Sequence, residues 1–119
     1  MRVYVATSAE KLKEFLEAGQ ATFEEYLTPG QFDFDVNVDE EEQEHLISQL
    51  AADDSFELNG GKFAYVLALD LEDAQLDGDL ITVDFKQVAA LLRAEDGEEL
   101  SWFAPEEIKF QIDSWLSIQ

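Results

Sequence analysis

The chain has 119 residues and carries 28 Asp and Glu against 7 Lys and Arg, which gives a formal net charge of −21. A surface this negative repels phosphate backbones and acidic lipids, so direct binding to nucleic acid or to a membrane is disfavoured. Because the chain contains no Cys, disulfides, thiolate catalysis and cysteine-ligated metals are excluded.

Length and composition predict one folded domain over residues 1–119. Hydrophobic residues make up 46% of the chain and aromatic residues 12%, which is more than an acidic disordered chain would contain. The first residues lack an apolar leader, and the longest apolar run, residues 63–69, is too short to cross a membrane. We therefore expect a cytoplasmic protein, and the absence of Cys fits a reducing compartment.

The first 30 residues predict a strand followed by a helix. Residues 2–6 alternate apolar and polar positions and are expected to form a strand. Thr7 and Glu10 match a capping box that would begin a helix, and Gly19 would end it. Residues 21–27 fit either a short helix or a strand, and a turn follows at residues 28–30.

The next segment is predicted to be an acidic strand followed by an acidic helix. Apolar and acidic residues alternate over residues 32–38, which is typical of a strand with one buried face. A helix would begin at Asp39, with three Glu residues near the positive end of its dipole. Its apolar stripe is expected to contain Leu46, Ile47, Leu50 and Ala51.

Strands dominate the predictions for the following forty residues. Residues 55–58 and 62–71 are expected to pair as a hairpin around the Asn-Gly-Gly turn at residues 59–61. Residues 63–69 are apolar on both faces, which is typical of a central strand. A further strand is expected over residues 80–85, after a turn at residues 77–79.

The C-terminal third predicts a short helix over residues 87–93, a short strand over residues 100–103 and a last helix that begins near Pro105. The last helix places Ile108, Ile112, Trp115 and Leu116 on one buried stripe. Phe110 lies off that stripe and is expected to be exposed. Together the elements predict an α+β domain, with a mixed or largely antiparallel sheet and about three to four helices.

Several short pieces resemble an uncharacterised, mostly actinobacterial protein family whose members begin Met-Arg-Val-Tyr-Val-Pro. This chain begins with the same five residues and has Ala6 in place of the Pro. The other pieces are Thr28-Pro29 before the helix with Glu41, Glu42 and Glu44, the run at residues 66–70, and the run at residues 100–107. The resemblance implies one intact bacterial domain but no activity, cofactor or catalytic residue.

One acidic pattern has the spacing of a calcium-binding loop. Its candidate ligands occupy loop positions 1, 3, 5, 7, 9 and 12 and are Asp33, Asp35, Asn37, Asp39, Glu41 and Glu44. The pattern departs from the motif at Val38, where a Gly is needed for the sharp turn, and at Glu40, where an apolar residue is usual. A solvated acidic strand edge explains the same residues and is favoured over a metal site.

No other residues point to catalysis or to a cofactor. A second acidic group at Asp70, Glu72, Asp73, Asp77 and Asp79 is accounted for by turn chemistry, with weak cation binding as an alternative. His45 is the single His, so a catalytic mechanism in which a His activates a nucleophile is disfavoured. The expectation is therefore a protein that is not an enzyme and has no cofactor.

The charge predicts a protein-interaction module that binds a basic surface on another protein, with association that weakens as salt rises. The expected contact residues are Asp33, Asp35, Asp39, Glu40, Glu41, Glu42, Glu44 and Phe110. Two alternatives stay open. One is a nucleic-acid mimic that inhibits a DNA- or RNA-binding protein, and the other is a divalent-cation-binding protein.

Overall fold

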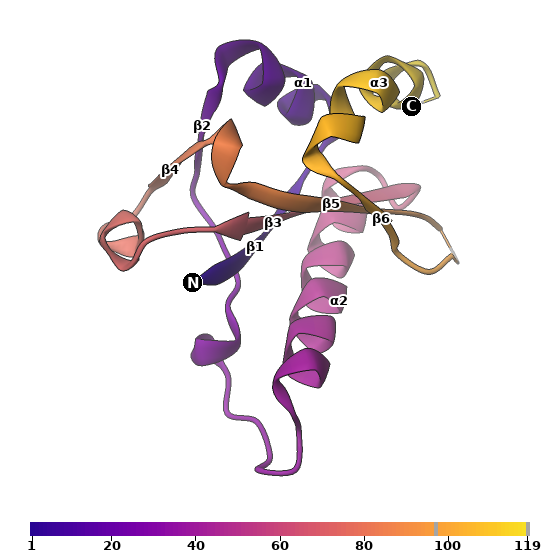
Figure 1. The fold of residues 1–119 in the computed structure, drawn as a ribbon. Coiled ribbons are helices and arrows are strands. Elements are labelled where there is room, and N and C mark those ends of the chain that lie inside the picture. Colours follow the sequence, from indigo (N-terminus) through magenta and orange to yellow (C-terminus); the bar gives the residue numbers. More distant parts are fainter. Residues whose placement is uncertain (97, 119) are drawn as a thin grey trace.

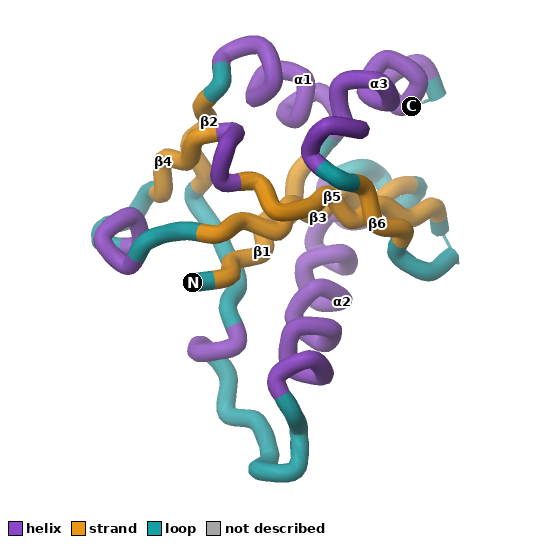
Figure 2. Tube along the Cα trace, viewed as in Figure 1, coloured by secondary structure: helices purple, strands orange, loops and turns teal. Residues whose placement is uncertain are grey.

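The computed structural model describes residues 1–96 and 98–118. Its main feature is a four-stranded antiparallel sheet of β1 (Arg2–Thr7), β3 (Phe63–Asp70), β5 (Val88–Glu95) and β6 (Ser101–Phe103), in the order β1-β3-β5-β6. α2 (Glu40–Leu58) covers one face of the sheet, and α1 (Ala9–Ala18) and α3 (Pro105–Ser117) lie on the other side (Figures 1 and 2). A separate two-stranded ribbon pairs β2 (Gln20–Phe23) with β4 (Ile81–Asp84).

This architecture confirms the prediction of an α+β fold. The described part of the chain contains three α-helices and six strands, and every strand pairing within it is antiparallel. Three short 3₁₀ turns at Pro29–Gln31, Asp73–Leu76 and Phe85–Gln87 complete the described elements. No helix among the described residues is long and apolar enough to cross a membrane.

The central position of β3 follows from its sequence. Because successive side chains of a strand point to opposite faces, Tyr65, Leu67 and Leu69 pack with α1 and α3, whereas Val66 and its neighbouring alanines pack against α2. All these side chains are almost fully buried. The small alanines on the second face let α2 lie close to the sheet through Ile47 and two alanines of its own.

The first helix begins one residue later than predicted. Ser8, not Thr7, is the N-cap, and its hydroxyl accepts a hydrogen bond from the Lys11 amide over 3.2 Å. Thr7 stays in β1 as its last residue. The helix ends at Gly19 as predicted, because this residue adopts the left-handed conformation with φ of +76°.

The predicted strand over residues 32–38 does not form. Residues 24–39 instead form a long connection that contains one 3₁₀ turn and runs beside α2 (Figure 1). Asp35 explains the irregularity, since its carboxylate accepts a hydrogen bond from the Asn37 amide and its carbonyl accepts one from Val38. Such local bonds compete with strand pairing. Val36 is consequently 97% exposed.

Two further predictions are wrong for related reasons. Residues 55–58 are the last turn of α2 and not a hairpin strand, because Asn59 caps this helix and Gly60 and Gly61 take positive φ values just after it. An Asn-Gly pair can end a helix as readily as it turns a hairpin. Residues 87–93 are not a helix: Gln87 ends a 3₁₀ turn and residues 88–93 form most of β5, because pairing with β3 and β6 overrides the helix preference of their Leu and Ala residues.

The ambiguous residues 21–27 contribute to β2, which pairs with β4. Past β2 the chain bends, and only Leu27 returns to the main sheet. It forms an isolated bridge with Tyr4, in which each amide donates to the other residue's carbonyl over 2.9 and 2.8 Å. This bridge fastens the long connection to the outer edge of β1.

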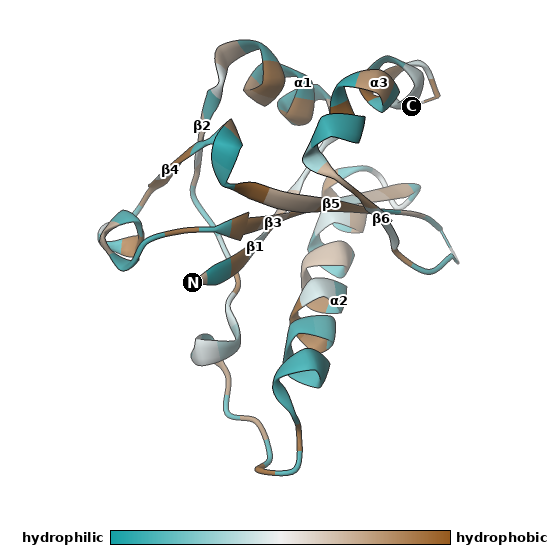
Figure 3. Cartoon of the chain, in the orientation of Figure 1, coloured by the Kyte–Doolittle hydropathy of each residue, from teal (hydrophilic) through white to brown (hydrophobic). Residues whose placement is uncertain are grey.

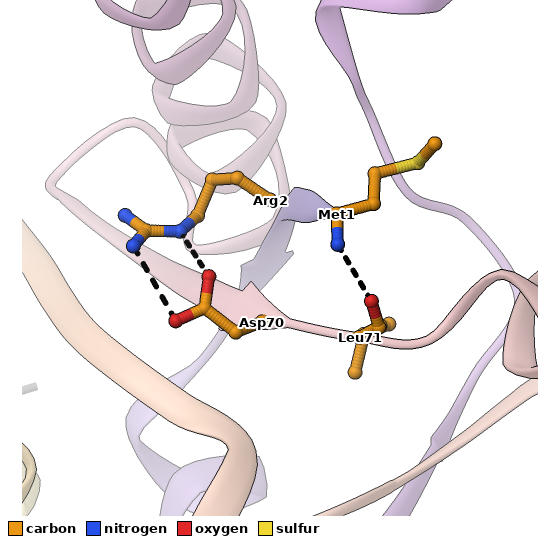
Figure 4. Close-up of polar contacts among 4 residues, drawn as sticks. All are labelled: Met1, Arg2, Asp70 and Leu71. Carbon is orange, nitrogen blue, oxygen red and sulfur yellow. Dashed lines mark hydrogen bonds and ion pairs between the residues drawn. The ribbon is translucent and has the colours of Figure 1, made fainter.

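The start of the chain is fixed to the end of β3, as Figure 4 shows. The Met1 ammonium group donates a hydrogen bond to the Leu71 carbonyl over 2.7 Å. Arg2 lies opposite Asp70 in the ladder, and its guanidinium donates to both carboxylate oxygens, over 2.7 and 3.4 Å. This hydrogen-bonded pair also raises the pKa of Arg2 further.

The last helix forms as predicted, with Ile108, Ile112 and Trp115 buried. Trp115 meets Phe103 edge to face, with 5.1 Å between the ring centres. Arg93 extends into the same cluster, and its guanidinium lies 5.2 to 5.5 Å from the ring centres of Phe63, Tyr65 and Trp115.

Candidate protein-binding surface

The long connection and α2 together form a side of the molecule that carries no Lys or Arg. We call residues 24–58 the acidic side. It contains twelve carboxylates and one His, His45. The connection runs beside α2, and the hydrophilic first turns of this helix project past the sheet (Figure 3). The seven Lys and Arg residues all lie outside residues 24–58.

Few of these carboxylates have a positive partner. The three ion pairs found among residues 1–96 and 98–118 use Asp70, Asp113 and Glu95, all of which lie outside the acidic side. No ion pair among the described residues therefore offsets the negative charge of the acidic side.

Two of the predicted calcium ligands have structural roles instead. Asp39 is the N-cap of α2, and its carboxylate accepts a hydrogen bond of 2.8 Å from the Glu42 amide. Asp35 closes the turn at Asn37. Among the described residues, no three Asp, Glu or His side chains lie close enough together to hold a metal ion. The acidic residues among the six candidates thus do not form a metal-binding cluster in the described structure.

The predicted partner-binding residues fall into two separate places. The acidic ones lie at the tip of the connection and in the first two turns of α2, and they are Asp33, Asp35, Asp39, Glu40, Glu41, Glu42 and Glu44. All of them are exposed except Glu44, which is half-buried. Phe110 is 75% exposed, as expected, but lies on α3 across the sheet (Figure 1). One flat partner surface could not contact both places.

The remaining sequence candidates are dispersed. His45 is exposed on the first half of α2. Asp70 pairs with Arg2, and the other acidic residues of its group, Glu72, Asp73, Asp77 and Asp79, are exposed around the 3₁₀ turn that follows β3. Trp102 is 61% exposed on β6, far along the chain from the acidic side.

A groove of about 740 Å³ lies within the acidic side, between the connection and the second half of α2. Glu24, Glu25 and Tyr26 form one wall, and Asp54, Glu57 and Leu58 form the other. Tyr4 and Ala6 of β1 line the groove between these walls. All four carboxylates are exposed, and Leu58 presents an apolar side chain that is 67% exposed.

Tyr4 reports on the electrostatics beside this groove. Burial raises the pKa of its phenol above the usual 10.0, and the negative charge of Glu44 raises it further, whereas Arg2 lowers it in part. The charge of Glu44 thus acts on a side chain of β1.

Sequence reasoning missed the groove entirely. Its acidic residues lie in two segments that are about thirty positions apart, and no motif connects them. Residues 55–58 were predicted as a strand, which would have placed Leu58 in the sheet rather than in this wall. In the structure α2 continues to Leu58, which places Asp54 and Glu57 one helical turn apart on the same face. A prediction that extended the helix this far would have brought these two carboxylates together.

The fold and this surface define an acidic α+β domain with a groove along one sheet edge. Comparisons of the chain with protein families, curated proteins and solved structures found no significant match. The resemblance to the actinobacterial family therefore stays a hypothesis, and function has to be argued from the surface itself.

Proposed function

We propose that this protein is a non-enzymatic interaction module that binds a basic surface of another protein through its acidic side. The observation that carries this proposal is the separation of charge. Twelve carboxylates and no Lys or Arg lie within residues 24–58, and none of these carboxylates forms an ion pair with the part of the chain that the structure describes. A basic partner would relieve their mutual repulsion on binding.

The shape of the acidic side supports the same proposal. The connection and the first turns of α2 project from the sheet (Figure 1). Asp33 and Glu40–Glu42 belong to these segments and are exposed, so they are accessible to a partner. Projecting charges of one sign speed the encounter with an oppositely charged partner, and this effect weakens as salt rises.

A role without catalysis fits the residues available. The chain has no Cys, and its single His is exposed on α2, away from any enclosed cavity described for the chain. We place the module in the cytoplasm, because a chain without Cys has none of the disulfides that stabilise many secreted domains.

Capture from a lysate of the source organism tests the proposal. The tagged protein is used at about 50 mM and about 300 mM salt, after nuclease treatment, beside a variant with Glu40, Glu41 and Glu42 changed to Gln. We expect a basic protein that is retained at low salt, lost at high salt and depleted on the variant. A matched variant with Glu14 and Glu17 of α1 and Glu106 of α3 changed to Gln should retain it.

The outcome also separates the alternatives. If the captured protein binds DNA or RNA, and nucleic acid competes for it, the module acts as a nucleic-acid mimic. If both variants lose the partner equally, net charge and not the acidic side carries the binding. If no basic protein is captured at low salt, the proposal fails.

A further inference from the structure

The outer edge of β1 is open beside the groove. In an antiparallel ladder, residues alternate between those that bond one neighbouring strand and those that bond the other. Met1 exchanges hydrogen bonds with Leu71 on the β3 side, whereas Tyr4 exchanges its bonds with Leu27 on the outer side. The alternation therefore places the amide and carbonyl of Ala6 on the outer side as well.

Nothing in the described chain pairs with Ala6 on that side. If the Tyr4–Leu27 bridge continued as a strand, Glu25 would lie opposite Ala6. The chain instead bends at Glu24 towards β2, and the groove opens at this point. A second hollow of about 430 Å³ also contacts Ala6 and Leu58 and extends the groove towards Asn59, and Glu10 and Lys11 line this extension.

We propose that the groove binds an extended, basic segment of the partner protein, which pairs its backbone with Ala6 and points Lys or Arg side chains at Asp54 and Glu57. This inference rests on the proposed function and names the form of its partner. Strand addition takes affinity from backbone hydrogen bonds and specificity from alternate side chains. The four carboxylates that line the groove, without any Lys or Arg, supply the charge complementarity.

The apolar side chains of the groove favour a partner segment that also carries apolar residues. Leu58 is 67% exposed and Tyr26 is half-buried in the opposite wall, so an apolar side chain of the segment can cover both. A segment that alternates basic and apolar residues meets this requirement. A polyamine offers only charge, and it would leave the Ala6 backbone and Leu58 uncovered.

The test measures the binding of a fluorescent, capped peptide of alternating Lys and Val by anisotropy at about 50 mM salt. Two protein variants lose the same charge at different places. One has Asp54→Asn with Glu57→Gln in the groove, and the other has Glu41→Gln with Glu42→Gln at the far end of α2. All four residues are exposed, and thermal unfolding checks that both variants fold. We expect about a tenfold loss of affinity for the groove variant and less than about threefold for its match.

A second peptide keeps the charges but carries N-methyl groups on alternate backbone amides, so that it cannot add as a strand. We expect it to bind about tenfold more weakly, and spermidine to compete poorly. Equal binding of both peptides, or displacement by spermidine at a similar concentration, would overturn strand addition.

The outcomes for the two proposals are distinct. If both protein variants weaken the peptide equally, the groove inference fails while a basic partner on the acidic side still stands. If the peptide does not bind and the capture experiment still yields a basic protein, only the groove inference fails. The proposed function fails only when that capture is negative.

Discussion

Ser55 on α2 donates a hydrogen bond of 2.8 Å to the carbonyl of Thr7, the last residue of β1. The same hydroxyl accepts a hydrogen bond of 2.7 Å from the amide of Tyr65, the residue opposite Thr7 on β3. The serine thus stands between two backbone groups of the last pair in the ladder. It fixes the C-terminal end of α2, and with it the wall of the groove, to the sheet.

We therefore expect Ser55→Ala to lower the free energy of unfolding by about 1–3 kcal/mol, because the buried Tyr65 amide loses its partner, while the Thr7 carbonyl retains the hydrogen bond from the Asn59 side chain. Urea denaturation followed by circular dichroism measures this loss. Ser48→Ala is the matched control, since Ser48 is also buried on α2 but donates only to the His45 carbonyl of its own helix. Equal losses for the two variants would refute the role given to Ser55.

Asp39 tests whether the acidic segment serves the helix or a cation. Asp39→Ala should lower the free energy of unfolding by about 1 kcal/mol, because α2 loses its N-cap. Asp39→Asn should retain most of that stability, since the amide oxygen can accept the same bond from Glu42. Thermal unfolding with and without micromolar Ca²⁺ adds the second readout. A saturable stabilisation by Ca²⁺ that Asp39→Asn abolishes would restore the calcium hypothesis.

The raised pKa of Tyr4 predicts how the stability of the fold changes in alkaline solution. Its pKa is raised in the folded protein, so the phenol ionises first in the unfolded chain. The stabilisation is complete below the unfolded value near 10 and is lost as pH rises through the folded value. Tyr4→Phe should weaken this alkaline fall in the melting temperature. The same slope above pH 10 in both proteins would contradict the shift.

The surroundings of Arg93 predict that Lys and Met substitutions at this position lower the free energy of unfolding by different amounts. Its Nε and Nη2 atoms are buried without a hydrogen-bond partner, although Nη2 lies 3.8 Å from the Glu95 carboxylate, and its guanidinium carbon lies 5.2 to 5.5 Å from the centres of three aromatic rings. Arg93→Lys should cost about 1 kcal/mol or more, because a compact, strongly hydrated ammonium cannot stack in this way. Arg93→Met keeps the bulk and buries no unpaired donor, so it should cost less. Denaturant titrations that rank the two variants in the opposite order would refute this explanation.

The sequence predicted those elements whose signals are local. Residues 63–69 are apolar on both faces, and Pro105 begins a helix whose stripe of Ile and Trp is plain, so β3 and α3 were expected. Residues 87–93 were misassigned because Leu and Ala favour a helix, and only their pairing with β3 makes them a strand. Residues 32–38 alternate like a strand, yet the local turn at Asp35 and the lack of a pairing strand leave them irregular.

For the candidate surface, too, the features that depend on local sequence were predicted, and those that depend on tertiary packing were not. The acidity of residues 33–44 is visible in the sequence, and so is the exposure of Phe110. The groove is not visible there, because it depends on where β1, the connection and the end of α2 meet. The placement of Phe110 across the sheet from α2 likewise depends on the packing of the two helices (Figure 1).

The most direct test of the central claim is a nuclear magnetic resonance titration of the ¹⁵N-labelled protein with the alternating Lys and Val peptide. A basic partner on the acidic side predicts the largest amide shift changes within residues 24–58, with Ala6, Glu25 and Leu58 among them. The amides of α1 and α3 should change little, and added salt should reverse the shifts. Changes spread evenly over all acidic elements, or centred on Phe110, would contradict the claim.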